Sequence, residues 1–194
     1  NGYLLNEPWE IKNKSGSFFK VFTPFWRHCN EITRNRKPNK KLQNIKFYNL
    51  KLKNSKNIQE LNLTNKKLKW TDKIFKHWLP GENNAQLQLK EFINKKADKY
   101  STGRDRPDQN LTSKLSPYLH FGEISPIEIY NQIRVTKKIN SENKDKFLAE
   151  IGWRDFSYNL LYHYPDMTKE PIQNKFNKFP WLNDNKNLKK WQKG

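Results

Sequence analysis

A run of hydroxyl side chains and one lysine precedes a proline that can start a helix, in residues 112–117 (TSKLSP). The first turn of a helix leaves backbone N–H groups unpaired and carries a partial positive charge, which attracts phosphate groups. Threonine and serine hydroxyls add hydrogen-bond donors there, and Lys114 adds a positive charge. The segment therefore indicates a phosphate or diphosphate site. An ordinary helix cap, the structural alternative, would use the same residue types.

A second group of polar side chains shares one stripe of a predicted helix. Glu150, Trp153 and Arg154 recur at spacings of three and four residues, and Ser157 continues the stripe. A carboxylate, an indole and a guanidinium on one face could together bind a flat ligand with hydrogen-bonding edges. The alternative is an ion pair between Glu150 and Arg154 beside a tryptophan of the core.

Two of the seven arginines, Arg104 and Arg106, lie in residues 100–107 (YSTGRDRP), after a predicted helix. Loop arginines are good contacts for phosphate, so this segment indicates a contact with nucleic acid, with a solvated loop as the alternative. Four histidines (His28, His77, His120 and His163) lack metal-binding spacing, and Cys29 is the single cysteine. We therefore expect no metal site, no intrachain disulfide and a reduced, cytoplasmic setting. The motifs GxGxxG, GxxxxGK[ST] and GxSxG are absent from the sequence.

The elements that would position these residues are mainly helices. Helical periodicity predicts helices over 83–100, 143–164 and 185–193. Two further helices are predicted from their start signals. One begins at Thr23-Pro24 with Thr23 as N-cap, and the other runs from a capping box at Ser125–Glu128 to about residue 138. A hairpin around 14–17 is expected to lead into a strand over 18–22. Residues 31–82 are rich in Lys and Asn and poor in periodicity, which is typical of a long connection.

The composition favours a polyanionic partner, with nucleic acid ahead of a membrane surface. Lys and Arg number 38 against 19 Asp and Glu, a formal charge of +19. The cations are 31 Lys and 7 Arg beside 25 Asn, a bias that an A/T-rich coding sequence alone would produce. The few arginines are therefore more informative than the many lysines. The sequence contains no apolar run long enough for a transmembrane helix.

Four blocks, in order along the chain, resemble signatures of the DNA photolyase/cryptochrome family. They are VFTPFW (21–26), TSKLSPYLHFGEISP (112–126), FLAEIGWRDFSYNLLYHYP (147–165) and FPW…WQKG (179–194). The resemblance implies a mainly α fold in three parts: 1–30, the end of an α/β Rossmann-like antenna domain; 31–82, the interdomain linker; and 83–194, the first part of an all-helical FAD-binding domain.

The resemblance also implies a cofactor, FAD, held largely at its phosphates. The positions that it assigns to FAD are Tyr100, Thr112, Ser113, Lys114, Leu115, Ser116 and Phe147. Lys114 stands where the family usually has Arg, which keeps the charge and loses the forked geometry. Phe147 stands where some members have Trp. A second antenna chromophore, of folate or deazaflavin type, is a further expectation.

The implied reaction is carried out by a deoxyribodipyrimidine photolyase, a carbon–carbon lyase. In the family, reduced FAD excited by blue light donates an electron to a pyrimidine dimer flipped out of DNA. By resemblance, Glu150 would hydrogen-bond the dimer, Trp153 would stack on it, and Arg154 would help hold the site and strand. Arg104 would contact DNA phosphate. Trp181 matches the outermost member of the tryptophan chain that photoreduces the flavin.

The resemblance is greatest to class I photolyases that repair cyclobutane dimers, acting as monomers on DNA. A cryptochrome-type photoreceptor is the first alternative, and a non-enzymatic basic nucleic-acid-binding module is a distant one. The chain ends before the TGYP-containing stretch of the family. We therefore expect it to be a central fragment that alone neither holds FAD tightly nor repairs DNA.

Overall fold

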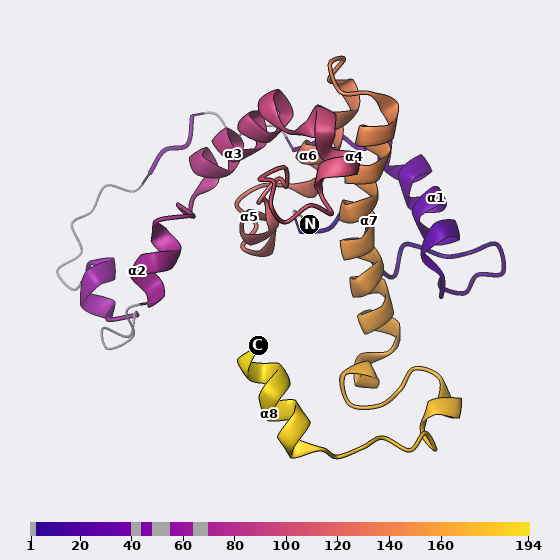
Figure 1. Cartoon of the computed structure of the whole chain (residues 1–194). Helices are drawn as coiled ribbons and strands as arrows, with labels where there is room; N and C mark the ends of the chain where they lie inside the picture. The colour runs from indigo at the N-terminus through magenta and orange to yellow at the C-terminus, as the bar shows by residue number, and fades with distance from the viewer. Residues whose placement is uncertain (1–2, 40–43, 48–54, 64–69) are drawn as a thin grey trace.

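The computed structural model describes residues 3–39, 44–47, 55–63 and 70–194, which form helices and no strand (Figure 1). The α-helices are α1 (Phe22–Thr33), α2 (Trp70–Phe75), α3 (Glu82–Lys95), α4 (Tyr100–Gly103), α5 (Ser116–His120), α6 (Pro126–Val135), α7 (Ser141–His163) and α8 (Asn185–Lys193). The short 3-10 helices are η1 (Ile58–Leu61), η2 (Ala97–Lys99), η3 (Pro165–Thr168) and η4 (Asn174–Phe176). The expected all-helical character of the FAD-binding part is confirmed.

Helix α7 is the axis of the molecule. It contacts α1 on one side and α4, α6 and η2 on the other, whereas α2 and α8 extend away from this bundle (Figure 1). The Asn140 side chain caps its start by accepting a hydrogen bond from the Asn143 backbone N–H at 2.8 Å. Helix α7 ends at His163, two residues before Pro165, because proline has no backbone N–H to continue the helical hydrogen bonds.

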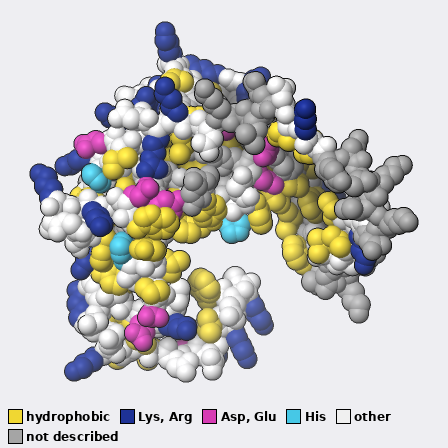
Figure 2. Space-filling view, turned by 180° about the vertical axis from the view of Figure 1, so that it is seen from behind, with side chains coloured by type: hydrophobic (Ala, Val, Ile, Leu, Met, Phe, Trp, Pro, Cys, Tyr) yellow, Lys and Arg dark blue, Asp and Glu magenta, His cyan; other side chains and the backbone are white. Residues whose placement is uncertain are grey.

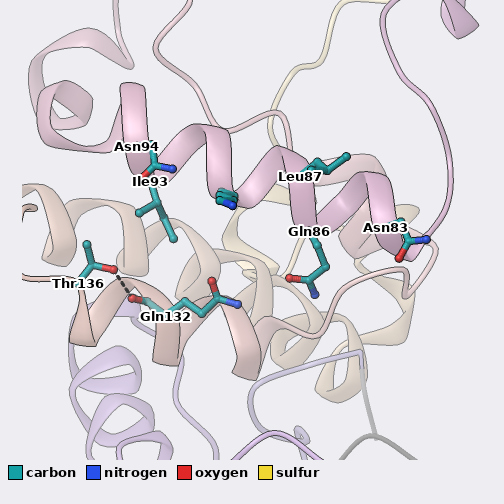
Figure 3. A pocket seen from close by; sticks show the side chains of 8 residues that line it. Asn83, Gln86, Leu87, Ile93, Asn94, Gln132 and Thr136 are labelled. Atoms are coloured by element: carbon teal, nitrogen blue, oxygen red, sulfur yellow. Dashed lines mark hydrogen bonds between the residues drawn. The ribbon is translucent and has the colours of Figure 1, made fainter.

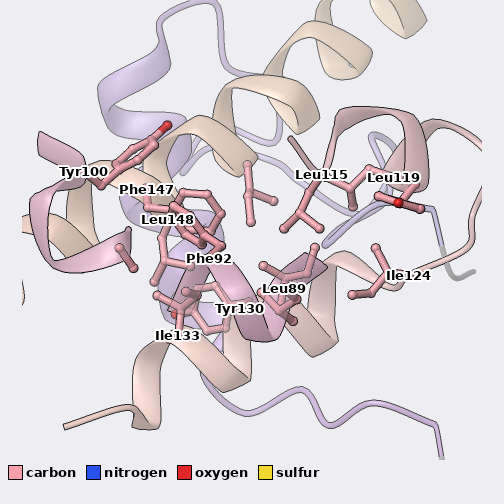
Figure 4. Packing of buried hydrophobic residues seen from close by; sticks show 14 of the residues in the cluster. Leu89, Phe92, Tyr100, Leu115, Leu119, Ile124, Tyr130, Ile133, Phe147 and Leu148 are labelled. Carbon is pink, nitrogen blue, oxygen red and sulfur yellow. The ribbon is translucent and has the colours of Figure 1, made fainter. Parts of the chain in front are cut away.

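The main core lies where α3, α5, α6 and α7 meet. Its side chains interdigitate from all four helices, as Figure 4 shows. They include Leu89 and Phe92 from α3, Tyr130 from α6 and Phe147 from α7. This arrangement fixes α7 against the α3–α6 layer, so that the polar stripe of α7 has a defined direction.

A second cluster joins α1 to α7. Phe25 and Cys29 of α1 are buried against Phe156 of α7, where burial raises the pKa of the Cys29 thiol. The two helices approach closely at Gly152, where an added Cβ would lie 2.3 Å from Cε3 of Trp26. Only a residue without a side chain fits this crossing as it stands.

A buried carboxyl group ties the N-terminal segment to the same pair of helices. Oδ2 of Asp155 accepts a hydrogen bond from the Asn6 backbone N–H at 3.0 Å, and the Asn6 side-chain amide donates to Oγ1 of Thr33 at 2.9 Å. Burial raises the pKa of Asp155 to about 7, against the smaller opposing effects of its hydrogen bonds and of Arg154. This polar contact orients residues that lie far apart in the sequence.

The predicted strand over 18–22 is wrong, although the turn before it is present. The Asn13 side chain accepts hydrogen bonds from the backbone N–H groups of Ser15 and Ser17, each at 3.0 Å. Phe18 then stacks on His163 with ring centroids 4.1 Å apart, instead of pairing its backbone in a sheet. The aromatic side chain of Phe18 thus packs against the end of helix α7, and this segment forms no strand.

Several helix ends also differ from the prediction. Helix α1 starts at Phe22 with Val21 as its N-cap, so Thr23 is not the cap. The predicted helix over 83–100 ends at Lys95 and continues as η2 and α4. At Ser125 no capping box forms, because the Glu128 carboxylate accepts hydrogen bonds from Gln86 and Gln132 instead. The predicted helix over 185–193 is confirmed by α8.

The proposed boundary at residue 30 falls inside α1, which continues to Thr33 and packs on α7. Parts of the predicted linker, 40–43, 48–54 and 64–69, lie outside the described residues. The division into antenna domain, linker and FAD-binding domain stays a prediction. Within the part of the chain that the structure describes, no helix is both long and apolar enough to cross a membrane.

Candidate cofactor and DNA site

Two of the predicted segments meet between α4 and α7. The guanidinium of Arg104, one residue past α4, donates a hydrogen bond to the Glu150 carboxylate and forms an ion pair with it. Nε of Arg104 also lies 3.2 Å from Oδ1 of Asp105, and its guanidinium lies 5.8 Å from the centre of the Tyr100 ring. The hydrogen bond with Glu150 is the main reason that the pKa of Arg104 is raised.

The loop arginines are therefore already paired with carboxylates. Arg104 faces Glu150 and Asp105, and Arg106 donates two hydrogen bonds to Asp108, each of 3.0 Å. A phosphate group would have to compete with these carboxylates for either guanidinium. The phosphate contact predicted for Arg104 thus requires an exchange of partners.

Trp153 presents an open aromatic surface in the middle of α7. Its side chain is 45% exposed, although Phe22 stacks on it at 3.6 Å between ring centroids. Phe156 contacts the indole edge-on at 5.8 Å. A large, half-exposed tryptophan held by two other rings is suited to stacking on a flat ligand.

Arg154 does not pair with Glu150, so the structural alternative considered for this stripe is wrong. Its Nη1 donates to the Tyr3 backbone carbonyl at 2.6 Å, and its guanidinium lies 4.4 Å from the centre of the Tyr3 ring. Nη2 donates to the Leu119 carbonyl at 3.4 Å. Arg154 thereby joins α7 to the N-terminal segment and to α5.

The hydroxyl-rich segment lies at the start of α5. Lys114 has a left-handed backbone (φ 55°), and Ser116 is the first residue of the helix. The side-chain amide of Gln88 donates to the Ser113 carbonyl at 2.9 Å, which anchors the segment to α3. Thr112 and Ser116 are exposed, and within the described residues their hydroxyls make no hydrogen bond. Free hydroxyls beside a lysine are a donor set that fits the phosphates of FAD.

Three residues predicted to contact FAD lie in the core. Tyr100 and Phe147 meet edge to face at 5.1 Å between ring centroids, and Phe147 is 5% exposed (Figure 4). Leu115 is also buried. Burial is the main cause of the raised pKa of Tyr100. In this structure these side chains support the surrounding helices and offer little free surface.

Trp181 lies between η4 and α8 and is 70% exposed. Its ring contacts Phe179 at 4.6 Å between centroids. In Figure 1 this segment extends away from the middle of α7, which carries Glu150 and Trp153. The structure therefore does not bring Trp181 together with the other predicted catalytic residues.

Two features were missed by the sequence reasoning. Phe22, whose ring covers one face of Trp153, gave no local signal beyond its place in the VFTPFW block. A groove of about 670 Å³ between α3 and α6 was also missed (Figure 3). Its lining comprises Asn83, Gln86, Leu87, Lys90, Ile93, Asn94, Gln132 and Thr136. Amide side chains have no distinctive spacing by which a sequence could reveal them.

The positive charge is not gathered into one patch on the face that Figure 2 shows. Lys and Arg side chains are scattered around its edge, and apolar side chains line the hollow between the bundle and the extending helices (Figure 2). This distribution agrees with the compositional origin suggested by the many lysines. Charge alone therefore does not locate a DNA site on this face.

The chain is similar in sequence to known photolyases and cryptochromes. The family model described as the FAD binding domain of DNA photolyase matches residues 147–194. A deoxyribodipyrimidine photo-lyase of Agrobacterium fabrum is 34% identical over 198 residues, covering 100% of this chain and 40% of the relative. Cryptochrome-2 of Arabidopsis thaliana is 33% identical over 206 residues, covering 100% of this chain and 34% of the relative.

A solved structure shows the same fold. The crystal structure of a bacterial class III photolyase from Agrobacterium tumefaciens superposes with a TM-score of 0.81 at 33% identity, covering 99% of this chain and 40% of that one. The chain belongs to the DNA photolyase/cryptochrome family, and FAD is the cofactor that this membership supports. It spans about 40% of the length of that photolyase. The narrower expectation of a class I enzyme stays a prediction.

Proposed function

We propose that the protein containing this chain repairs cyclobutane pyrimidine dimers in DNA, using FAD and blue light. The observation that carries this proposal is the exposed stripe of α7, where a carboxylate and an open indole lie one helical turn apart. A pyrimidine offers a flat face and imide N–H groups, and flipped bases are held by stacking and edge hydrogen bonds. A photoreceptor that only signals does not need a binding site for a pyrimidine dimer.

In this proposal the cofactor is held by the segment at the start of α5. Thr112, Ser113 and Ser116 would offer hydroxyls to its phosphates, and Lys114 would add a positive charge. Tyr100, Leu115 and Phe147 would form the wall behind them. When bound, FAD supplies the light-absorbing electron donor. Trp181 would belong to the route that reduces it.

The residues proposed for DNA recognition would have different roles. Arg104 contacts Oε1 of Glu150, so the other carboxylate oxygen, Oε2, would accept a hydrogen bond from the dimer. Trp153 would stack on the dimer. Arg154 would hold the strand indirectly, by fixing the N-terminal segment against α7. Arg104 would reach DNA phosphate once the phosphate displaces a carboxylate.

The test uses the native protein purified with FAD and a duplex that contains one cyclobutane dimer. We expect restoration of the two pyrimidines under blue light and none in the dark. A duplex with a (6-4) product serves as the specificity control. Loss of the dimer in the dark, or no loss in the light from a fully reduced flavoprotein, would contradict the proposal.

A cryptochrome-type photoreceptor is the second candidate. The observation in its favour is that cryptochrome-2 of Arabidopsis thaliana is almost as similar to this chain as the Agrobacterium photo-lyase. It predicts light-dependent flavin reduction without dimer repair, so the same experiment separates the two. A basic nucleic-acid-binding module would bind DNA without any flavin. The antenna chromophore, the monomeric state and the cytoplasmic location stay predictions from the sequence.

A further inference from the structure

The indole of Trp153 is held by a ring from a distant part of the chain. Phe22, the first residue of α1, stacks on it face to face, with centroids 3.6 Å apart and ring planes at 8°. Phe156 meets both rings at a steep angle, with centroids 5.8 Å from each. We call Phe22, Trp153 and Phe156 the aromatic platform.

The three rings of the platform differ in exposure. Phe156 is buried, Phe22 is half-buried and Trp153 is 45% exposed. Phe22 covers one face of the indole, and Phe156 approaches its edge. Within the described residues no other ring contacts Trp153, and its 45% exposure leaves indole surface for a flat ligand.

The position of Phe22 is itself fixed by the helix crossing. Its ring is parallel to that of Trp26, with planes at 6° and centroids 6.4 Å apart. Trp26 in turn packs directly on Gly152, the residue before Trp153. Because α1 cannot slide along α7 without breaking this contact, the Phe22 ring has little freedom to leave the indole.

We propose that Phe22 is a positioning residue, which fixes the plane of Trp153 so that its exposed surface is ready to stack on a pyrimidine dimer flipped out of DNA. This inference rests on the function proposed above. Binding of a base by stacking is weaker when the aromatic side chain must first be ordered, because its conformational entropy is lost on binding. A ring that is already held in place avoids this cost. Phe22 acts through Trp153 and need not touch the lesion.

Three variants of the native FAD-containing protein separate positioning from simple packing. Phe22→Leu removes the stacked ring and keeps an apolar side chain, whereas Phe22→Tyr restores a ring. Phe19→Leu is the matched control, because the Phe19 ring contacts Phe25 and His28 and has no ring contact with Trp153. The thermal midpoint of each variant is measured first, so that lost stability can be compared.

The first measurement concerns the stack itself and needs no DNA. The protein is labelled with 5-fluorotryptophan, and the ¹⁹F resonance of Trp153 is identified by its loss in Trp153→Phe. We expect this resonance to move in Phe22→Leu and to return towards its original position in Phe22→Tyr. A resonance that stays in place in Phe22→Leu would overturn the inference, because Phe22 would then not set the environment of the indole.

The second measurement compares affinity for dimer-containing and undamaged duplex in the dark. We expect the lesion preference of Phe22→Leu to fall about tenfold, in line with the loss of one base–aromatic stack. Phe22→Tyr and Phe19→Leu should keep it. An equal fall in Phe19→Leu at equal stability would show a merely structural role. If the unaltered protein has no lesion preference, the proposed function fails; an unaltered preference in Phe22→Leu overturns only this inference.

Discussion

At the scale of single residues, two carboxyl groups of α7 have opposite roles. Glu150 is partly exposed and paired with Arg104, so its charge is compensated at the surface. Asp155 is buried, and only one of its oxygens accepts a hydrogen bond. The first is suited to recognise a ligand, and the second makes the stability of the fold depend on pH.

Replacing Glu150 should change DNA recognition in two directions. In Glu150→Gln we expect the preference for dimer-containing duplex to fall about tenfold, because a charge-assisted hydrogen bond is lost. Affinity for undamaged duplex should rise, since Arg104 keeps only the Asp105 carboxylate as a partner and a phosphate competes with it more easily. Both are measured by competition binding in the dark. Repair should slow while flavin binding is kept.

The control for this change is Asp145→Asn, which removes one negative charge at an exposed position of the same helix. It should raise affinity for both duplexes equally. An unchanged lesion preference in Glu150→Gln would contradict the role assigned to this carboxylate.

Asp155 should make the folded state less stable as the pH rises. Burial raises its pKa to about 7, so between about pH 4 and 7 the folded protein binds a proton that the unfolded chain releases. The stability from this proton is complete at low pH and is lost as the pH passes the folded pKa. Asp155→Asn should remove the dependence and stabilise the fold at pH 8 by on the order of 1–3 kcal/mol. Urea unfolding at pH 5 and pH 8 measures this; an equal pH dependence in the variant would exclude Asp155 as its source.

At the scale of elements, the crossing of α1 and α7 depends on one glycine. A Cβ at position 152 would lie 2.3 Å from Trp26, and the nearest indole atoms belong to a packed ring. We expect Gly152→Ala to destabilise the fold by about 1–3 kcal/mol despite the better helix propensity of alanine. Thermal unfolding measures the change. Ser157→Ala, an exposed position on the same helix, is the control and should be nearly neutral.

The helices were largely predictable from the sequence, and their partners were not. The last helix, over 185–193, has the expected bounds because helical periodicity is a local signal, and in the structure the Asp184 side chain caps its start. The strand predicted over 18–22 does not form, because aromatic side chains of this segment pack on α7. This tertiary contact overrides the local strand propensity. Glu128 was expected to cap its own helix and instead accepts from Gln86 of α3.

The same distinction applies to the candidate site. The stripe Glu150, Trp153 and Arg154 could be predicted, since helical spacing alone places these residues on one face. That Arg104 pairs with Glu150 could not, because 46 residues separate them. Phe22 was missed for the same reason.

At the scale of the whole molecule, the charge of +19 acts as a general field. Scattered lysines should give strong, salt-dependent binding to any duplex. We expect Trp153→Leu to leave the slope of log affinity against log salt unchanged for undamaged DNA and to reduce only the lesion preference. A titration from low to physiological salt checks this. A changed slope would mean that Trp153 affects contacts with phosphate.

The hydrogen bond from Asn6 to Asp155 joins residues 149 positions apart and has a consequence for the order of folding. Contacts of α7 with α4 and η2 close loops of 42 to 46 residues, whereas docking of the N-terminal segment closes one of 149 residues. Contacts that close long loops are expected to form late, because the conformational entropy of the intervening chain must be lost before the contact stabilises the structure. The Phe22–Trp153 stack is therefore expected to form among the last contacts of the chain. A partly folded molecule would bind DNA through its lysines but could not yet distinguish a damaged base from an intact one.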